Sequence, residues 1–279
     1  MFTCVHFGCC LKMPFFDRDN LRFHYLERGK GVPFIFQHGL GGDSDRIFSL
    51  LNPPPAFRLL GLDCRAHGET RPLGPEEKLG FDSFADDLIG LMDFLDLQHA
   101  ILGGTSMGAG VALNCALRYP HRCLGLVLLR PAWLDHPLAE NVVIFATIAS
   151  LIRRHGPEKG AKLFQKSDLY SAILRQSSDA TGSLLELFLN PRSLETVARL
   201  ERIPTDVPNR DRTEWRKIAA PTLVLANRSD PIHPFEYGST LAREIPSARL
   251  IELTPKSVNL AQYTAELRAH IDSFLQHYA

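Results

Sequence analysis

The sequence predicts an α/β protein in which a mainly parallel central sheet is flanked by helices. Short apolar strand patterns alternate with longer helical patterns, which is the order typical of such proteins. The segment Leu124–Leu129 is wholly apolar, as expected for a strand that is covered on both faces. Strand patterns then stop between about Pro131 and Trp215, which indicates a helical insertion. We therefore expect a core of residues 15–130 and 216–279 and a helical cap of residues 131–215.

Several segments carry strand patterns, and the chain between them carries helical or turn patterns. The predicted strands are Leu21–Glu27, Pro33–Gln37, Phe57–Leu62, His99–Gly103, Leu124–Leu129, Pro221–Leu225 and Arg249–Leu253. Ser83 and Asp86 fit a capping box, which predicts the start of a helix. Further helices are predicted at Ala139–Arg154, Pro157–Phe164, Leu184–Leu189, Leu194–Leu200 and Leu260–Leu275. An insertion between two core strands should lie over the carboxyl edge of the sheet, where open α/β sheets bind ligands.

The composition excludes several classes of partner. Lysine plus arginine equals aspartate plus glutamate, 31 against 31, so charge gives no reason to expect nucleic acid or an anionic membrane. No apolar run reaches the roughly 20 residues that a membrane span needs. Neither a metal-ligand spacing nor a dinucleotide fingerprint is found, so we expect no metal and no cofactor. The sequence leaves the oligomeric state open.

The six cysteines and the first residues bear on the cellular setting. The cysteine spacing fits neither a disulfide scaffold nor a zinc site, so a reducing, cytoplasmic setting is expected. The segment Met1–Lys12 lacks the basic and apolar parts of a signal peptide. We expect residues 1–14 to form a disordered extension, with Met13 as the true start of the chain as the open alternative.

The first candidate catalytic motif is Gly104-Thr105-Ser106-Met107-Gly108, which matches the pattern G-x-S-x-G. An apolar strand precedes this segment and a helix of small residues follows it, as the pattern requires. Such a turn holds the serine in a strained conformation and exposes its hydroxyl above the sheet. The helix N-terminus and the Met107 amide should then face the place where an oxyanion forms. Ser106 is therefore the predicted nucleophile.

With this turn the sequence resembles the α/β-hydrolase superfamily, from about residue 15 onwards. His38–Gly42 looks like the family's oxyanion loop, which implies the Leu40 amide as the second oxyanion donor. Asp63–Gly68 looks like the family's D-x-R-x-H-G segment. The resemblance implies an α/β-hydrolase fold with a helical cap. Ser106, in place of the aspartate of dehalogenases and epoxide hydrolases, implies acyl transfer through a covalent ester.

The resemblance also implies the position of the catalytic acid. The family order is serine, acid, histidine, and Asp230 follows the predicted strand that ends at Leu225. Asp230 is therefore the expected acid. Asp135, which follows an earlier strand, is the alternative.

The general base is harder to assign from the sequence. The family places its histidine after the last strand, but the corresponding loop, residues 254–259, contains none. Lys256 stands near that position. His233, three residues past Asp230, is our candidate for the base. His136, Lys256 and the absence of any base remain open alternatives.

These residues support one main hypothesis and two alternatives. The main hypothesis is a serine hydrolase, acting on an ester, lactone or similar small acyl substrate through a Ser106 acyl-enzyme. The first alternative is a non-hydrolytic, lyase-like enzyme on the same scaffold. The second is a ligand-binding relative that lacks the usual base, because fold alone does not determine function.

Overall fold

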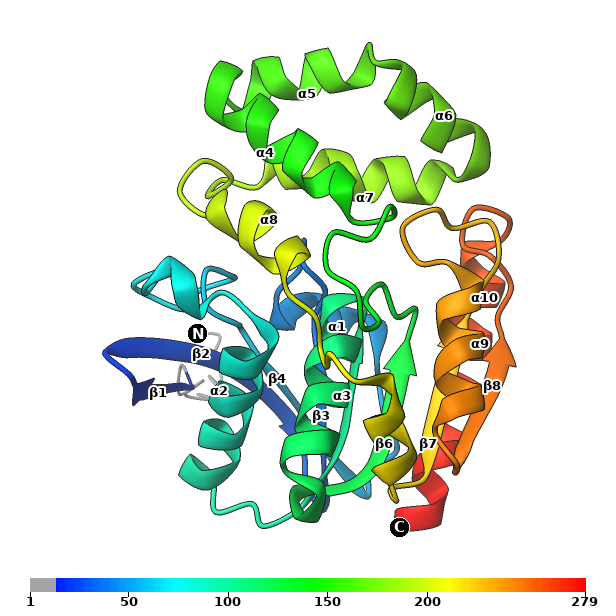
Figure 1. Cartoon of the computed structure of the whole chain (residues 1–279). Helices are drawn as coiled ribbons and strands as arrows, with labels where there is room; N and C mark the ends of the chain where they lie inside the picture. Colours follow the sequence, from blue (N-terminus) through cyan, green and yellow to red (C-terminus); the bar gives the residue numbers. More distant parts are fainter. Residues whose placement is uncertain (1–13) are drawn as a thin grey trace, which may run out of the picture.

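A computed structural model describes residues 14–279, and an eight-stranded sheet forms its centre (Figure 1). The strands follow the order β1-β2-β4-β3-β5-β6-β7-β8, in which β2 runs antiparallel to its neighbours β1 and β4 and every other neighbouring pair is parallel. Their bounds are β1 Phe15–Arg18, β2 Leu21–Gly29, β3 Val32–Gln37, β4 Phe57–Leu62, β5 Ala100–Thr105, β6 Cys123–Leu129, β7 Thr222–Ala226 and β8 Ala248–Glu252. The predicted fold class is confirmed. The extension expected at residues 1–14 lies, except for its last residue, outside the described residues.

Helices cover both faces of the sheet. On one face, α2 (Phe81–Phe94), α3 (Met107–Arg118) and α9 (Phe235–Glu244) contribute to one apolar core. On the other face, α1 (Ser44–Leu50) and α10 (Leu260–Leu275) contribute to a second core. The central strands are apolar on both sides because both of their faces are buried.

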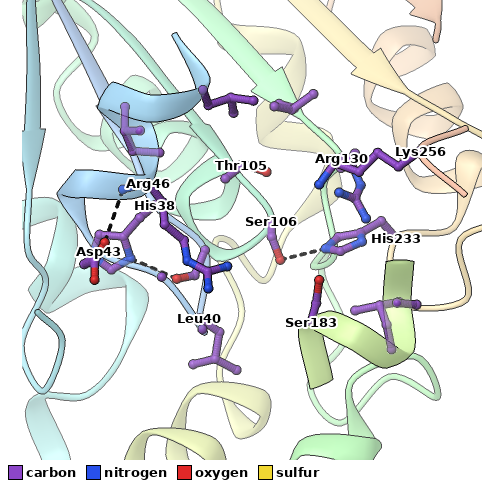
Figure 2. Close-up of a pocket in the computed structure, with 18 of the residues that line it drawn as sticks. His38, Leu40, Asp43, Arg46, Thr105, Ser106, Arg130, Ser183, His233 and Lys256 are labelled. Carbon is purple, nitrogen blue, oxygen red and sulfur yellow. Dashed lines mark hydrogen bonds between the residues drawn. The ribbon is translucent and has the colours of Figure 1, made fainter. Parts of the chain in front are cut away.

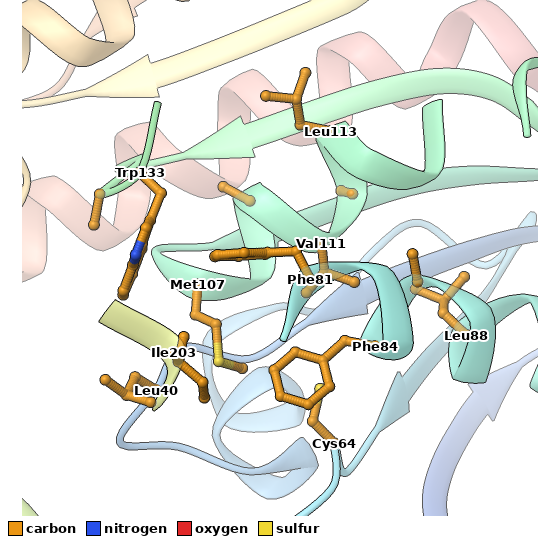
Figure 3. Close-up of a cluster of buried hydrophobic side chains, with 14 of the residues drawn as sticks. Leu40, Cys64, Phe81, Phe84, Leu88, Met107, Val111, Leu113, Trp133 and Ile203 are labelled. Atoms are coloured by element: carbon orange, nitrogen blue, oxygen red, sulfur yellow. The ribbon is translucent and has the colours of Figure 1, made fainter. Parts of the chain in front are cut away.

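The first core anchors the turn that carries Ser106. Met107, the next residue, is fully buried together with Phe84 and Ile203, and Figure 3 shows these side chains in one cluster. Burying a side chain of this size stabilises the fold by about 1.5–3 kcal/mol. The residue beside the predicted nucleophile is thus fixed by packing.

The helical insertion lies over the carboxyl ends of the parallel strands (Figure 1). It contains α4 (Val143–His155), α5 (Pro157–Gln165), α6 (Asp168–Gln176), α7 (Ser178–Leu189) and α8 (Ala198–Arg202). The sequence analysis did not predict α6, a helix of nine residues in which Ile173 is the one buried apolar side chain. The core and cap boundaries given above stay a prediction.

The start of α2 differs from the prediction. The helix begins at Phe81 with Gly80 as its N-cap, so Ser83 lies inside it and forms no capping box. The Phe81 amide instead donates to the Asp206 carboxylate at 2.9 Å. A residue far along the chain therefore satisfies this helix terminus, which local sequence could not reveal. Over residues 14–279, the structure contains no helix that is long and apolar enough to cross a membrane.

Candidate active site

Ser106 occupies a strained turn between β5 and α3. Its backbone angles are φ 57° and ψ −116°, outside the regions that L-residues normally adopt. Gly104 and Gly108 make the turn possible, since a Cβ on Gly104 would lie 2.2 Å from the Gly108 backbone. The pattern G-x-S-x-G thus has a direct steric cause in this chain.

The structure brings Ser106, His233 and Asp230 together in one hydrogen-bonded chain, and Figure 2 shows the hydrogen bond between Ser106 and His233. His233, in the loop after β7, places Nε2 at 2.9 Å from Ser106 Oγ. Its Nδ1 lies 3.0 Å from Asp230 Oδ2 and 3.1 Å from Oδ1. A carboxylate accepts only, so Nδ1 carries the proton and Nε2 is left to accept the Ser106 hydroxyl hydrogen.

Asp230 is buried, and both of its carboxylate oxygens accept hydrogen bonds. Its Oδ1 accepts the backbone amides of Ile232 and His233, both at 3.2 Å. Its Oδ2 accepts Arg130 Nε at 2.9 Å and a second guanidinium nitrogen. Burial alone would raise the pKa of Asp230, but His233 and Arg130 hold it well below the usual range. The carboxylate is therefore ionised at neutral pH.

The imidazole of His233 is held in its neutral form. Burial lowers the pKa of His233, Arg130 and Lys256 lower it further, and Asp230 opposes them. Since the ordinary histidine pKa is about 6.5, the ring is unprotonated at neutral pH. A neutral ring is the state that can take a proton.

The loop that resembles the family's oxyanion loop packs directly on Ser106. A Cβ on Gly39 would lie 3.3 Å from the Ser106 Cβ. The Cys64 amide donates to His38 Nε2 at 3.1 Å, so His38 Nδ1 carries the proton and donates to the Gly39 carbonyl at 2.9 Å. The Gly42 amide donates to the same carbonyl at 2.9 Å. Two hydrogen bonds therefore fix the orientation of the peptide that carries the Leu40 amide.

A cavity of about 670 Å³ opens above Ser106, between the carboxyl edge of the sheet and the helical insertion. Its apolar lining is contributed by Leu40, Ile47, Leu50, Leu129, Phe145, Leu184, Leu187 and Ile232. Charged side chains line it as well, with Asp43, Asp45 and Arg46 from the α1 region, and Arg130 and Lys256 near His233 (Figure 2). The volume and the mostly apolar lining are typical of a small-molecule site.

The alternative acid and bases that the sequence offered lie outside the hydrogen-bonded chain of Ser106, His233 and Asp230. Asp135 binds Arg212, at 2.7 and 3.1 Å, and His136 is largely exposed. Neither lines the cavity at Ser106. Lys256 does line it, with Nζ 3.7 Å from Asp179 Oδ1. Within the part of the chain that the structure describes, no group of histidine, cysteine and acidic side chains could hold a metal ion.

Sequence reasoning missed Arg130, which donates two hydrogen bonds to the Asp230 carboxylate. Arg130 directly follows the wholly apolar strand β6 and is itself buried. A charged residue at the carboxyl end of a buried strand was the available signal, because that edge is where open sheets place their sites.

Comparison with known proteins agrees with this fold. A family model described as "alpha/beta hydrolase fold" matches residues 32–255. The chain belongs to this family. A 2-hydroxy-6-oxononadienedioate/2-hydroxy-6-oxononatrienedioate hydrolase of Comamonas testosteroni is 28% identical, over 92% of this chain and 89% of that protein. The predicted assignment to α/β-hydrolase-fold enzymes is confirmed by these matches.

Solved structures show the same fold. The enol-lactonase from Burkholderia xenovorans superposes with a TM-score of 0.70 at 22% identity, covering 94% of this chain and all 100% of that one. A thermophilic esterase from Thermogutta terrifontis gives a TM-score of 0.69 at 24% identity, covering 92% of this chain and 94% of that one. At these identities the likeness establishes the fold.

Proposed function

We propose that the protein is a serine hydrolase, which acts on an ester, lactone or similar small acyl substrate through an acyl-enzyme at Ser106. The observation that carries this proposal is the chain from the Ser106 hydroxyl through His233 to Asp230, with distances of 2.9 and 3.0 Å. A serine hydroxyl becomes a nucleophile when an adjacent base removes its proton. The base is most effective when a carboxylate orients it, which is the role of Asp230.

In the first half-reaction, Ser106 Oγ attacks the carbonyl carbon while His233 Nε2 takes the hydroxyl proton. Asp230 stabilises the imidazolium that forms, and the former carbonyl oxygen carries the negative charge. His233 then gives the proton to the leaving oxygen as the carbon–oxygen bond breaks, which leaves the acyl group on Ser106. Water repeats the sequence, with His233 as base, and releases the acid.

The Leu40 and Met107 amides are the proposed oxyanion donors. In a trans peptide the N–H points opposite to the C=O. The Gly39 carbonyl is held by His38 and Gly42, so the Leu40 amide is turned away from His38. The Met107 amide begins α3, where the helix dipole is positive. Loss of one such donor typically costs about 10²–10³-fold in kcat.

The relatives support hydrolysis as the reaction class, since those compared above are named as a hydrolase, an enol-lactonase and an esterase. The lyase-like and ligand-binding alternatives depended on the lack of a histidine in residues 254–259. His233, beside Ser106, is a candidate for that base. No observation on this chain now favours either alternative.

The proposal can be tested by trapping the acyl-enzyme. Short-chain p-nitrophenyl esters should give a burst of nitrophenol and an acyl adduct on Ser106 in mass spectra. The Ser106→Ala variant should give neither. Ser183→Ala is the matched control, because Ser183 lines the same cavity and should keep both signals. An adduct that persists on Ser106→Ala protein, or hydrolysis that is unaffected by it, would contradict the proposal.

A further inference from the structure

Lys256 lies in the loop where the superfamily's histidine is expected, and the chain from Ser106 to Asp230 does not use it. It follows β8 and lines the cavity that Ser106 and His233 also line. Figure 2 shows Lys256 next to Arg130, on the same side of the cavity as His233. Only 23% of the Lys256 side chain is exposed, so a cationic group is held mostly away from water.

The Lys256 ammonium can donate more hydrogen bonds than its nearest carboxylate accepts. It offers three N–H donors. Among residues 14–279, the one carboxylate paired with it is Asp179, whose Oδ1 lies 3.7 Å away. That separation is longer than a hydrogen bond, which spans about 2.7–3.2 Å for nitrogen donors. Asp179 is also shared, because its Oδ2 lies 3.3 Å from an Arg130 nitrogen.

Arg130 is the second cation at this end of the cavity, and unlike Lys256 it already donates hydrogen bonds to carboxylates. Its Nε and a second guanidinium nitrogen both donate to Asp230, and the latter also reaches Asp179. Burial and the charge of Arg130 lower the pKa of Lys256, although Asp179 opposes them. A further anion beside Lys256 would therefore stabilise its charged form.

We propose that Lys256 binds a carboxylate of the substrate, so that the preferred substrates are acyl compounds carrying a second, anionic group. This inference rests on the proposed function, and it names the substrate class of the same site. The ammonium supplies charge-assisted hydrogen bonds, which are stronger than those between neutral groups. The apolar cavity lining, which includes Leu129, Leu184 and Ile232, would contact the hydrocarbon between the carboxylate and the reacting carbonyl.

A pair of esters tests the inference. Mono-(p-nitrophenyl) adipate ends in a carboxylate, and p-nitrophenyl isooctanoate ends in a neutral group of similar shape. The wild-type protein should favour the adipate ester in kcat/KM. Lys256→Met should reduce the ratio of the two kcat/KM values by about 10- to 100-fold, which is the range for losing one charged hydrogen bond. Lys256→Arg, which keeps the charge, should retain much of the preference.

Arg46→Met is the matched control, because it also removes a cation from the cavity lining. Arg46 is paired with Glu186 and half exposed, and its loss should leave the ratio unchanged. An unchanged ratio in Lys256→Met protein, or an equal change in Arg46→Met protein, would overturn the inference.

The inference and the proposed function can fail separately. If Ser106→Ala abolishes hydrolysis of both esters while Lys256→Met leaves their ratio intact, only the inference fails. If the wild-type protein hydrolyses neither ester, calorimetric binding of both to Ser106→Ala protein still tests Lys256 without turnover. The inference is supported if the double variant Ser106→Ala/Lys256→Met binds the adipate ester more weakly than Ser106→Ala protein does. It is refuted if the two proteins bind this ester equally.

Discussion

Two aspartate–histidine pairs are buried in this protein, His24–Asp63 next to the Asp63–Gly68 turn and His233–Asp230 beside Ser106. Their hydrogen bonds are similar, at 2.8 Å and 3.0 Å. The pKa of His24 is nevertheless raised, because burial lowers it but the hydrogen bond to Asp63 and the charges of Asp63, Asp45 and Glu69 together outweigh burial. The pKa of His233 is lowered, because Arg130 adds to the effect of burial and Asp230 only partly compensates.

Besides burial, the groups around each carboxylate contribute to this difference in pKa. Asp63 receives the Ser44 and Glu69 amides in addition to His24. Asp230 receives two amides and the Arg130 guanidinium in addition to His233. The same residue pair can therefore hold a structure together or provide a neutral base. A cation on the acid and a hydroxyl on the second imidazole nitrogen distinguish the two cases.

The largest expected effect is on activity. We expect His233→Ala to lower kcat for a p-nitrophenyl ester by about 10³–10⁴-fold, as for triad members elsewhere. His24→Ala should lower it by less than about tenfold, since His24 lies outside the cavity lining. Steady-state kinetics on folded protein, verified by circular dichroism, would measure both. Comparable losses in the two variants would break the comparison.

The next effect is on stability. Asp63→Ala removes the acceptor of two amides and of His24, so the free energy of unfolding should fall by about 3–5 kcal/mol. Asp93→Asn, which removes a charge from a surface pair with Arg122, should change it by less than about 1 kcal/mol. Urea unfolding curves would measure both values. A small effect of Asp63→Ala would show that this pair is not a structural support.

Arg130→Gln should sharpen the comparison through pH dependence. In the wild-type protein, kcat/KM should rise with pH through the His233 pKa, which lies below the ordinary value of about 6.5. Without Arg130 that pKa should increase, so the acid limb should move to higher pH. A pH–rate profile of both proteins tests this. If the acid limb of Arg130→Gln protein stays at the wild-type pH while kcat falls, Arg130 does not lower the His233 pKa and its role is structural.

The smallest effect concerns the pH dependence of stability. Because the pKa of His24 is raised in the folded protein, its contribution is fully present below the unfolded pKa of about 6.5. It is lost as pH rises through the folded pKa. The difference in unfolding free energy between wild type and His24→Gln should therefore be larger at mildly acidic pH than at alkaline pH. A difference that is constant across this range would contradict the raised pKa.

The sequence predicted most of the sheet because buried strands carry a local signal. Phe57–Leu62 was predicted with the bounds that β4 has, and β6 differs by one residue at its start. The strand β1 was not predicted, because its four residues are too short for a pattern. The start of α2 was misplaced, because Asp206 satisfies it from the cap.

The site residues that have a local sequence pattern of their own could be predicted from the sequence. Ser106 has its own five-residue pattern, and Asp230 follows a recognisable strand. His233 was one of several options, because its distance to Ser106 depends on how the loop after β7 folds back. Arg130 and Asp179 lie 100 and 51 residues from Asp230 in the sequence, so only the folded chain brings them together.

The activation of Ser106 by His233 is tested most directly by its rate of labelling with a fluorophosphonate probe, followed by mass spectrometry. We expect rapid labelling of Ser106 in the wild-type protein and in His24→Ala protein, none at that site in Ser106→Ala protein, and labelling slowed by several orders of magnitude in His233→Ala protein. Labelling of folded His233→Ala protein at the wild-type rate would contradict the account.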